Sequence, residues 1–244
     1  MPDKGRLTED IVAHVGPVVS PLYPPPPWKI SGARILKVIF ETDKEPVLDW
    51  LPPKLTRSSP PYGMIAVEHY PDTPVGPFTV AHQFIGCRAG FFVRAFALQS
   101  VVDCPVALAA LREVWGFPCR LGSVSLEERS GILTATIGTE GTTLCEVRMT
   151  DTESIEPDLV RFDPVLTLRL VPSLQENVRH DLIQLVQIDP DIEVRDAQRG
   201  KGVIEYPGQS EGQGWSVLPC RNVISVTCCT VDSELPLARF VMPY

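Results

Sequence analysis

The sequence lacks the charge pattern of a protein that binds nucleic acid. Its 244 residues include 30 acidic and 22 basic side chains, which gives a formal net charge of −8. The lysines and arginines are scattered along the chain, so no cluster of them could neutralise a run of phosphates. We therefore expect no nucleic-acid partner.

Cysteine and histidine are not spaced as they are in a zinc site. The seven cysteines form no C-x-x-C pair, and the four histidines show neither H-E-x-x-H nor H-x-H spacing. Free cysteines are common in a reducing compartment, where most of them are small buried hydrophobes. The sequence predicts neither a metal site nor a bound cofactor.

Long hydrophobic runs are also missing. The most apolar stretch, residues 101–111, contains Asp103 and Pro105 and is too short to span a bilayer. The first ten residues are charged and lack the apolar core of a signal peptide. We therefore expect a cytoplasmic protein with no membrane contact.

Proline, in contrast, is abundant and concentrated near the N-terminus. Four consecutive prolines at 24–27 exclude a helix and favour an extended segment. Residues 1–27 are therefore predicted to form an extended Pro-rich arm, which is compatible with a homo-oligomer. Residues 28–244 are predicted to form one domain, because a chain of this length with 44% hydrophobic residues can bury a full core.

Patterns of apolar residues predict many strands and few helices. Helices are expected at residues 44–51 and from Pro105 to Val114, the second ending at Gly116 and Pro118. Cys119 would then lie on a loop just past that helix. Strands are expected at residues 35–41, 63–70, 78–86, 91–99, 123–127, 132–137, 142–149, 166–170, 182–194, 202–206 and 223–231. The predicted fold class is α+β and mainly β, a curved antiparallel sheet or barrel around a central pocket with a few helices.

One segment, Arg-Glu-Val-Trp-Gly-Phe-Pro-Cys-Arg-Leu-Gly at residues 112–122, resembles the active-site segment of the acetoacetate decarboxylase family. Further stretches resemble that family in the same order, at residues 20–29, 168–172 and 235–244. The resemblance spans nearly the whole chain. It implies an acetoacetate-decarboxylase-like fold and an oligomer.

The same resemblance implies that the family's chemistry is missing. In family members a lysine forms a Schiff base with the substrate ketone, and that lysine corresponds to Cys119, with its basic neighbour kept as Arg120. The family's carboxylate-binding arginine corresponds to Ala33, and its two pocket glutamates to Val80 and Ala66. We therefore expect no Schiff base, and a pocket that suits a larger and more apolar molecule.

Four residues are candidates for catalysis. His82 would share a strand face with Val80, so it is either a general acid or base in the pocket or a structural histidine. Cys119 is a nucleophile, a general acid or part of the pocket lining, and Arg120 beside it could polarise a carbonyl. Glu113 either holds the segment before Cys119 in place or takes part directly.

A second group of residues could contact the substrate. Arg34 follows Ala33, although a strand there would turn it to the opposite face. The aromatic members form either a pocket wall or part of the core. The candidate substrate-binding residues are Trp28, Arg34, Val80, Phe84, Trp115 and Phe117.

These expectations lead to one functional prediction with two alternatives. The chain is predicted to be an enzyme of secondary metabolism, a cyclase, isomerase or dehydratase that acts without a Schiff base on a bulky, apolar polyketide- or terpene-like substrate. Such an enzyme would orient the substrate by shape and polarise it with one or two donors. The alternatives are a non-catalytic protein that binds a hydrophobic ligand, and a decarboxylase or lyase with a different acid–base set.

Overall fold

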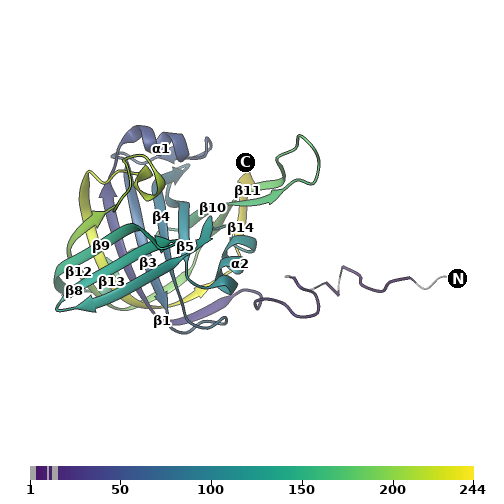
Figure 1. Ribbon diagram of the computed structural model, residues 1–244, viewed down its shortest axis with the longest axis horizontal. Coiled ribbons are helices and arrows are strands. Elements are labelled where there is room, and N and C mark those ends of the chain that lie inside the picture. Colours follow the sequence, from purple (N-terminus) through teal and green to yellow (C-terminus); the bar gives the residue numbers. More distant parts are fainter. Residues whose placement is uncertain (1–3, 10, 13–15) are drawn as a thin grey trace.

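One curved sheet dominates the computed structural model, which describes residues 4–9, 11–12 and 16–244. In Figure 1 the strands wrap into a barrel-like body, with α2 and the β10–β11 hairpin on one side of it. The elements in chain order are β1 (Trp28–Glu41), α1 (Lys44–Trp50), β2 (Thr56–Arg57), β3 (Tyr62–Tyr70), β4 (Phe78–Ala89), β5 (Phe92–Val102), α2 (Pro105–Glu113), β6 (Cys119–Leu121), β7 (Ser123–Arg129), β8 (Ile132–Thr139), β9 (Thr142–Ile155), the 3-10 helix η1 (Pro157–Leu159), β10 (Val165–Pro172), β11 (His180–Ile188), β12 (Asp191–Glu205), the 3-10 helix η2 (Gly214–Val217), β13 (Asn222–Leu235) and β14 (Arg239–Pro243).

The predicted class, α+β and mainly β, is confirmed. Neighbouring strands follow the order β14-β11-β10-β5-β4-β3-β1-β13-β12-β9-β8-β7, while β2 pairs with β4 and β6 with β5. The sheet is mixed and not wholly antiparallel, because β5 pairs in parallel with both β10 and β6.

Several predicted element boundaries are wrong. The segment 182–194 is not one strand, because Pro190 lacks a backbone N–H and separates β11 from β12. The short strands β6 and β14 were not predicted, and Cys119 opens β6, paired with Ser100 of β5, where a loop was expected. β12 runs without a break through residues 195–201, whose polar composition hides the strand.

Side chains alternate between two faces of β1, β3 and β4. On one face Leu36, Ile65 and Ile85 belong to a large apolar core that includes side chains of β7, β8 and β9. On the other face the paired residues Ile35, Glu68 and Val80 form a row across the three strands. Because the period of a strand is two, each of these strands contributes to the core and to the face on which α2 packs.

Helix α2 begins and ends where the sequence predicts. Pro105 occupies its first turn, and Gly116 beyond its C-terminus has a φ of +70°, which allows the Phe117 N–H to donate to the Leu111 carbonyl at 2.9 Å. A side chain at position 116 would meet the backbone of Arg169 at 3.0 Å. The glycine therefore lets the chain turn sharply and directs Phe117 towards the sheet.

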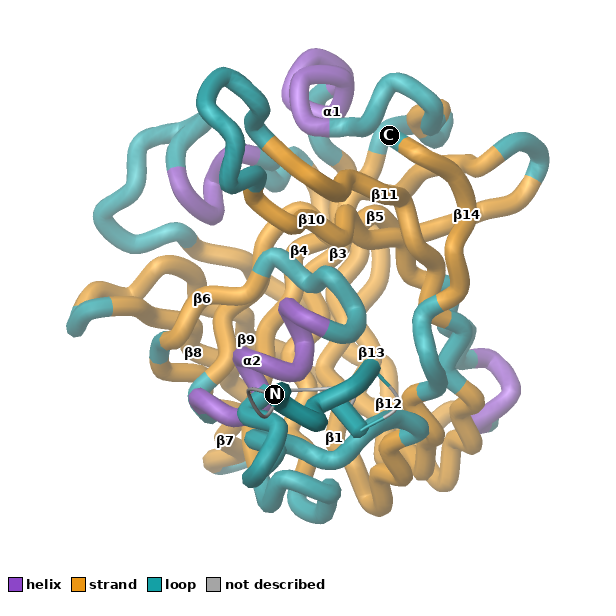
Figure 2. Tube along the Cα trace, turned by 90° about the vertical axis from the view of Figure 1, so that its right-hand side faces the viewer, coloured by secondary structure: helices purple, strands orange, loops and turns teal. Residues whose placement is uncertain are grey.

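Two buried tryptophans join three distant parts of the chain. The rings of Trp28 and Trp115 meet edge to face, with centroids 5.0 Å apart. The Trp28 indole N–H donates to the Pro24 carbonyl at 2.9 Å, and that of Trp115 donates to the Pro236 carbonyl at 2.7 Å. The start of β1, the end of α2 and the segment before β14 are thus held together on the side of the sheet that Figure 2 turns towards the viewer.

The chain before β1 has no helix or strand among its described residues. Figure 1 shows the described residues of its outer part running away from the sheet, whereas Tyr23, closer to β1, is buried against Trp28. Residues 1–3, 10 and 13–15 of the predicted arm lie outside the described residues, and the division at residue 27 stays a prediction. Within the described ranges, no helix has the length and apolar character needed to cross a membrane.

The two tryptophans generate a prediction about stability. Trp115 is fully buried, so Trp115→Ala is expected to lower the free energy of unfolding by about 3–5 kcal/mol, the usual cost of removing a large aromatic ring from a core. Trp50 is 54% exposed, and Trp50→Ala should change stability by less than about 1 kcal/mol. Urea denaturation followed by circular dichroism measures both. Equal losses in the two variants would contradict the role given to Trp115.

Candidate functional site

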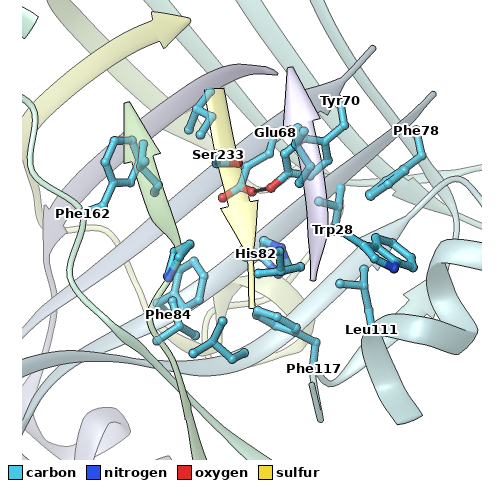
Figure 3. A pocket seen from close by; sticks show the side chains of 18 of the residues that line it. Trp28, Glu68, Tyr70, Phe78, His82, Phe84, Leu111, Phe117, Phe162 and Ser233 are labelled. Atoms are coloured by element: carbon cyan, nitrogen blue, oxygen red, sulfur yellow. Dashed lines mark hydrogen bonds between the residues drawn. The ribbon is translucent and has the colours of Figure 1, made fainter. Parts of the chain in front are cut away.

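An aromatic cavity lies against the face of β1, β3 and β4 that carries Ile35, Glu68 and Val80, and Figure 3 shows it from close by. It has a volume of about 90 Å³ and adjoins a second chamber of about 150 Å³, with which it shares Glu68, Phe84, Phe162, Asp163 and Val165. The first chamber is lined by Trp28, Ile30, Ile35, Glu68, Tyr70, Phe78, Val80, His82, Phe84, Leu111, Phe117, Phe162, Asp163, Val165, Ile188, Pro190, Ile192, Ser233 and Leu235.

His82 is the sequence-predicted catalytic candidate that lines this cavity. It is 3% exposed, and its Nδ1 lies 2.7 Å from the Ser100 hydroxyl. Its ring contacts those of Phe117 and Phe84, with centroids 4.7 and 5.4 Å away. Burial lowers the pKa of His82 to about 3, so the imidazole is neutral at physiological pH.

Cys119 does not line the cavity. Its side chain is fully buried on β6 and borders an open outer cleft with Arg112, Glu113 and Arg120. Burial raises the pKa of the Cys119 thiol to about 12, against smaller lowering effects of Ser100 and Arg112. A thiol that stays protonated is a poor nucleophile, so the geometry favours a supporting role for this residue.

The remaining catalytic candidates also lie outside the cavity. Arg120 is exposed in the outer cleft. Glu113 is exposed and accepts a hydrogen bond of 2.5 Å from the Tyr23 hydroxyl. Its neighbour Arg112 donates to the Cys119 carbonyl at 3.0 Å. The Arg112–Glu113 pair thus ties α2 to β6 and to the segment before β1.

The predicted substrate-binding residues divide into two groups. Trp28, Val80, Phe84 and Phe117 line the cavity, whereas Trp115 packs behind Trp28. Arg34 lies on the opposite face of β1, because successive side chains of a strand alternate, and it forms an exposed ion pair of 2.5 Å with Glu128. The structure therefore does not bring Arg34 to the cavity.

Glu68 and Tyr70 were missed by the sequence analysis. They lie two residues apart on β3 and face the cavity, where the Tyr70 hydroxyl donates to the Glu68 carboxylate, drawn as a dashed line in Figure 3. Burial raises the pKa of Glu68, partly offset by the Tyr70 hydrogen bond and the charge of Lys37. The signal was present in the sequence, because Glu68 shares a strand face with Ala66, to which a pocket glutamate of the family corresponds.

The polar residues of the cavity do not form a metal site. Among the residues that the structure describes, no group of three or more His, Cys, Asp or Glu side chains could hold a metal ion.

His82 generates a prediction about pH. In the unfolded chain the pKa of His82 is near 6.5, and in the folded protein it is about 3. Between these two pH values only the unfolded chain binds the proton. Stability is therefore lost as the pH falls through this range, by up to about 1.4 kcal/mol per pH unit. His82→Phe should reduce this slope, whereas His180→Phe, at an exposed position, should leave it unchanged. Urea midpoints at pH 6.5, 5.5 and 4.5 measure the slope, and identical slopes in both variants would contradict the expectation.

Comparison with known proteins places the chain in a family. The family model described as Acetoacetate decarboxylase (ADC) matches residues 14–244. Acetoacetate decarboxylase 1 of Mesorhizobium japonicum is 25% identical, over 95% of this chain and 95% of its own length. Among solved structures, the acetoacetate decarboxylase of Legionella pneumophila matches with a TM-score of 0.84 and 22% identity, covering 100% of this chain and 93% of that one. The enduracididine biosynthesis enzyme MppR, complexed with pyruvate, matches with a TM-score of 0.80 and 17% identity, covering 96% and 98%. This chain therefore belongs to the acetoacetate decarboxylase family.

Proposed function

We propose that the protein is a proton-transfer enzyme of secondary metabolism, an isomerase, cyclase or dehydratase that acts on an apolar carbonyl compound without a Schiff base at residue 119. The observation that carries the proposal is the Glu68–Tyr70 pair in the wall of an aromatic cavity. The same fold occurs in MppR, a protein named as a biosynthesis enzyme and complexed with pyruvate, itself a carbonyl compound.

Glu68 has the properties of a general base or acid. A carboxylate whose pKa is raised is a stronger base than an ordinary carboxylate, and its acid form can return the proton. Tyr70 holds the carboxylate in one orientation, and the aromatic wall keeps water from competing for the proton.

The proton transfer can be written from the residues present. The Glu68 carboxylate removes a proton from the carbon next to the substrate carbonyl, and the electron pair of that C–H bond moves into an enolate. Where a C=C bond extends the enolate, return of the proton from Glu68 to the far carbon gives an isomer. Attack of the enolate carbon on a second carbonyl group of the same molecule closes a ring, and the alkoxide so formed takes the proton from Glu68. A β-hydroxyl group that takes this proton leaves as water, which gives dehydration.

His82 can stabilise the enolate as a neutral donor. If its Nδ1 accepts the hydrogen bond from Ser100, the proton of the imidazole is on Nε2, where it can be donated to the enolate oxygen. Ser100 is also paired with Cys119 of β6, and its side chain lowers the pKa of the Cys119 thiol against the larger raising effect of burial. Cys119 is thus assigned a positioning role, because it would orient Ser100 and through it the imidazole.

The chamber volumes refine the substrate class. A dry apolar cavity of about 150 Å³ holds one molecule of benzene. Two adjoining chambers of about 90 and 150 Å³ therefore favour a compact substrate of one or two rings over an extended chain. This narrows the bulky substrate expected from the sequence to a small cyclic or branched one.

Acetoacetate provides the first test of function. The protein is expected to release no carbon dioxide from acetoacetate, and Cys119→Lys should not restore release, because residue 119 does not line the cavity. Gas release and acetone formation measure this, with the Mesorhizobium japonicum relative as the positive control. Robust release of carbon dioxide by the unaltered protein would contradict the proposal.

Exchange of hydrogen for deuterium in cyclohexanone tests Glu68. The protein should catalyse exchange next to the carbonyl in deuterium oxide, and Glu68→Gln should slow it about 100-fold or more, the usual contribution of a general base. Exchange should also rise with pH around a pKa above that of an ordinary carboxyl. Proton NMR follows the reaction.

The matched control for Glu68→Gln is Glu113→Gln, whose carboxylate lies outside the cavity. This control variant should keep its exchange rate. Binding of cyclohexanone without any exchange by the unaltered protein would instead support the alternative, a protein that only binds hydrophobic ligands.

A further inference from the structure

A buried lysine forms part of the wall of the second chamber. Lys37 lies on β1, is 9% exposed and faces the chamber with Met64 and Ala66 of β3. Lysine is rarely buried to this degree unless it is paired. The position of Lys37 therefore calls for an explanation.

The surroundings of the amine are poor in partners. Its Nζ donates to the backbone carbonyl of Arg161 and lies 4.6 Å from the ring centroid of Phe162. An ammonium group has three donors, and one carbonyl oxygen and one ring leave it incompletely satisfied. In the part of the chain that the structure describes, none of the ion pairs includes Lys37.

A second polar group beside Lys37 also lacks a partner among the described residues. Thr227 lies directly opposite Lys37 across the β1–β13 pair, and its buried Oγ1 makes no hydrogen bond there. Two incompletely satisfied polar groups at one register position leave hydrogen-bonding capacity for a ligand at the edge of an apolar chamber.

Lys37 and Cys119 lie at opposite ends of one row across the sheet. The row runs from Lys37 through Ala66, His82 and Ser100 to Cys119. Measured along the curved sheet, four strand spacings of about 4.8 Å place its ends about 19 Å apart. The amine of Lys37 lines the second chamber, whereas Cys119, where sequence reasoning looked for a lysine, lines neither chamber.

We propose that Lys37 is a reactive amine that condenses with an aldehyde or ketone group of the substrate in the second chamber. The proposal rests on the proposed function, because the carbonyl compound is the one that Glu68 deprotonates in the adjoining chamber. Burial lowers the pKa of Lys37, against smaller raising effects of Cys229, Asp163 and Glu68, and this increases the fraction of neutral amine.

The condensation balances without any further reactant. The Nζ lone pair attacks the carbonyl carbon, a C–N bond forms, and the π electrons of the C=O bond move to the oxygen, which takes up a proton. Transfer of a second proton to that oxygen and loss of one from nitrogen release water and leave a protonated imine. This cation acidifies the neighbouring C–H bond that Glu68 breaks, and hydrolysis by water returns the amine and the product carbonyl.

Reductive trapping with benzaldehyde tests the amine independently of proton transfer, because benzaldehyde has no hydrogen on the carbon next to its carbonyl. The protein is incubated with limiting benzaldehyde and sodium cyanoborohydride, and benzylated residues are located by peptide mass spectrometry. Residue 37 should be modified at least tenfold more than exposed Lys201. Lys37→Arg, which keeps a cation and a donor to Arg161 but cannot form the imine, should lose the labelling, and Lys201→Arg should keep it.

The outcomes separate the two proposals. Labelling confined to exposed lysines would overturn the role of Lys37, whether or not cyclohexanone exchange is observed. Exchange that depends on Glu68 while residue 37 stays unlabelled would leave the proton-transfer function standing without an imine. Labelling of residue 37 without exchange would support the reactive amine and contradict the proton-transfer function. The peptide map of the unaltered protein shows by itself whether residue 37 is benzylated, so the test stands even if Lys37→Arg fails to fold.

Discussion

The alternation of side chains along β1, β3 and β4 is the constraint on which the rest of the structure depends. Each strand supplies one face to the large apolar core and the other to the cavity. A shift of one residue in the register would bury Arg34 on the cavity side and move Glu68 into the core. The pairing that stabilises the sheet therefore also fixes which side chains can take part in chemistry.

Burial acts in the same sense on Glu68, His82 and Lys37, because it favours the neutral form of each group. It raises the pKa of Glu68 and lowers the pKa values of His82 and Lys37, although the three groups differ in chemical type. Glu68 and His82 can therefore give or take a proton without leaving a permanent charge among aromatic rings. An aromatic cavity with neutral polar groups is the environment that the proposed apolar carbonyl substrate requires.

The sequence predicted the elements that strong local signals define. Pro105 and Gly116 marked both ends of α2, and the spacing from Val80 brought His82 to the cavity. The middle of β12, residues 195–201, escaped prediction because its exposed polar side chains mask the strand period. Glu68 and Lys37 were overlooked because the comparison with the family considered only the positions that correspond to the family's functional residues. Their importance depends on pairing between strands far apart in the sequence, which local patterns do not contain.

The separation of the large core from the cavity has an evolutionary consequence. The side chains that pack between β1, β3, β4 and β7–β9 lie on the face opposite the cavity, so mutations in the cavity wall leave that packing largely intact. A lineage could therefore discard one set of reactive groups and acquire another while each intermediate sequence still folded. The core would keep the protein folded while substitutions on the cavity face changed the reaction.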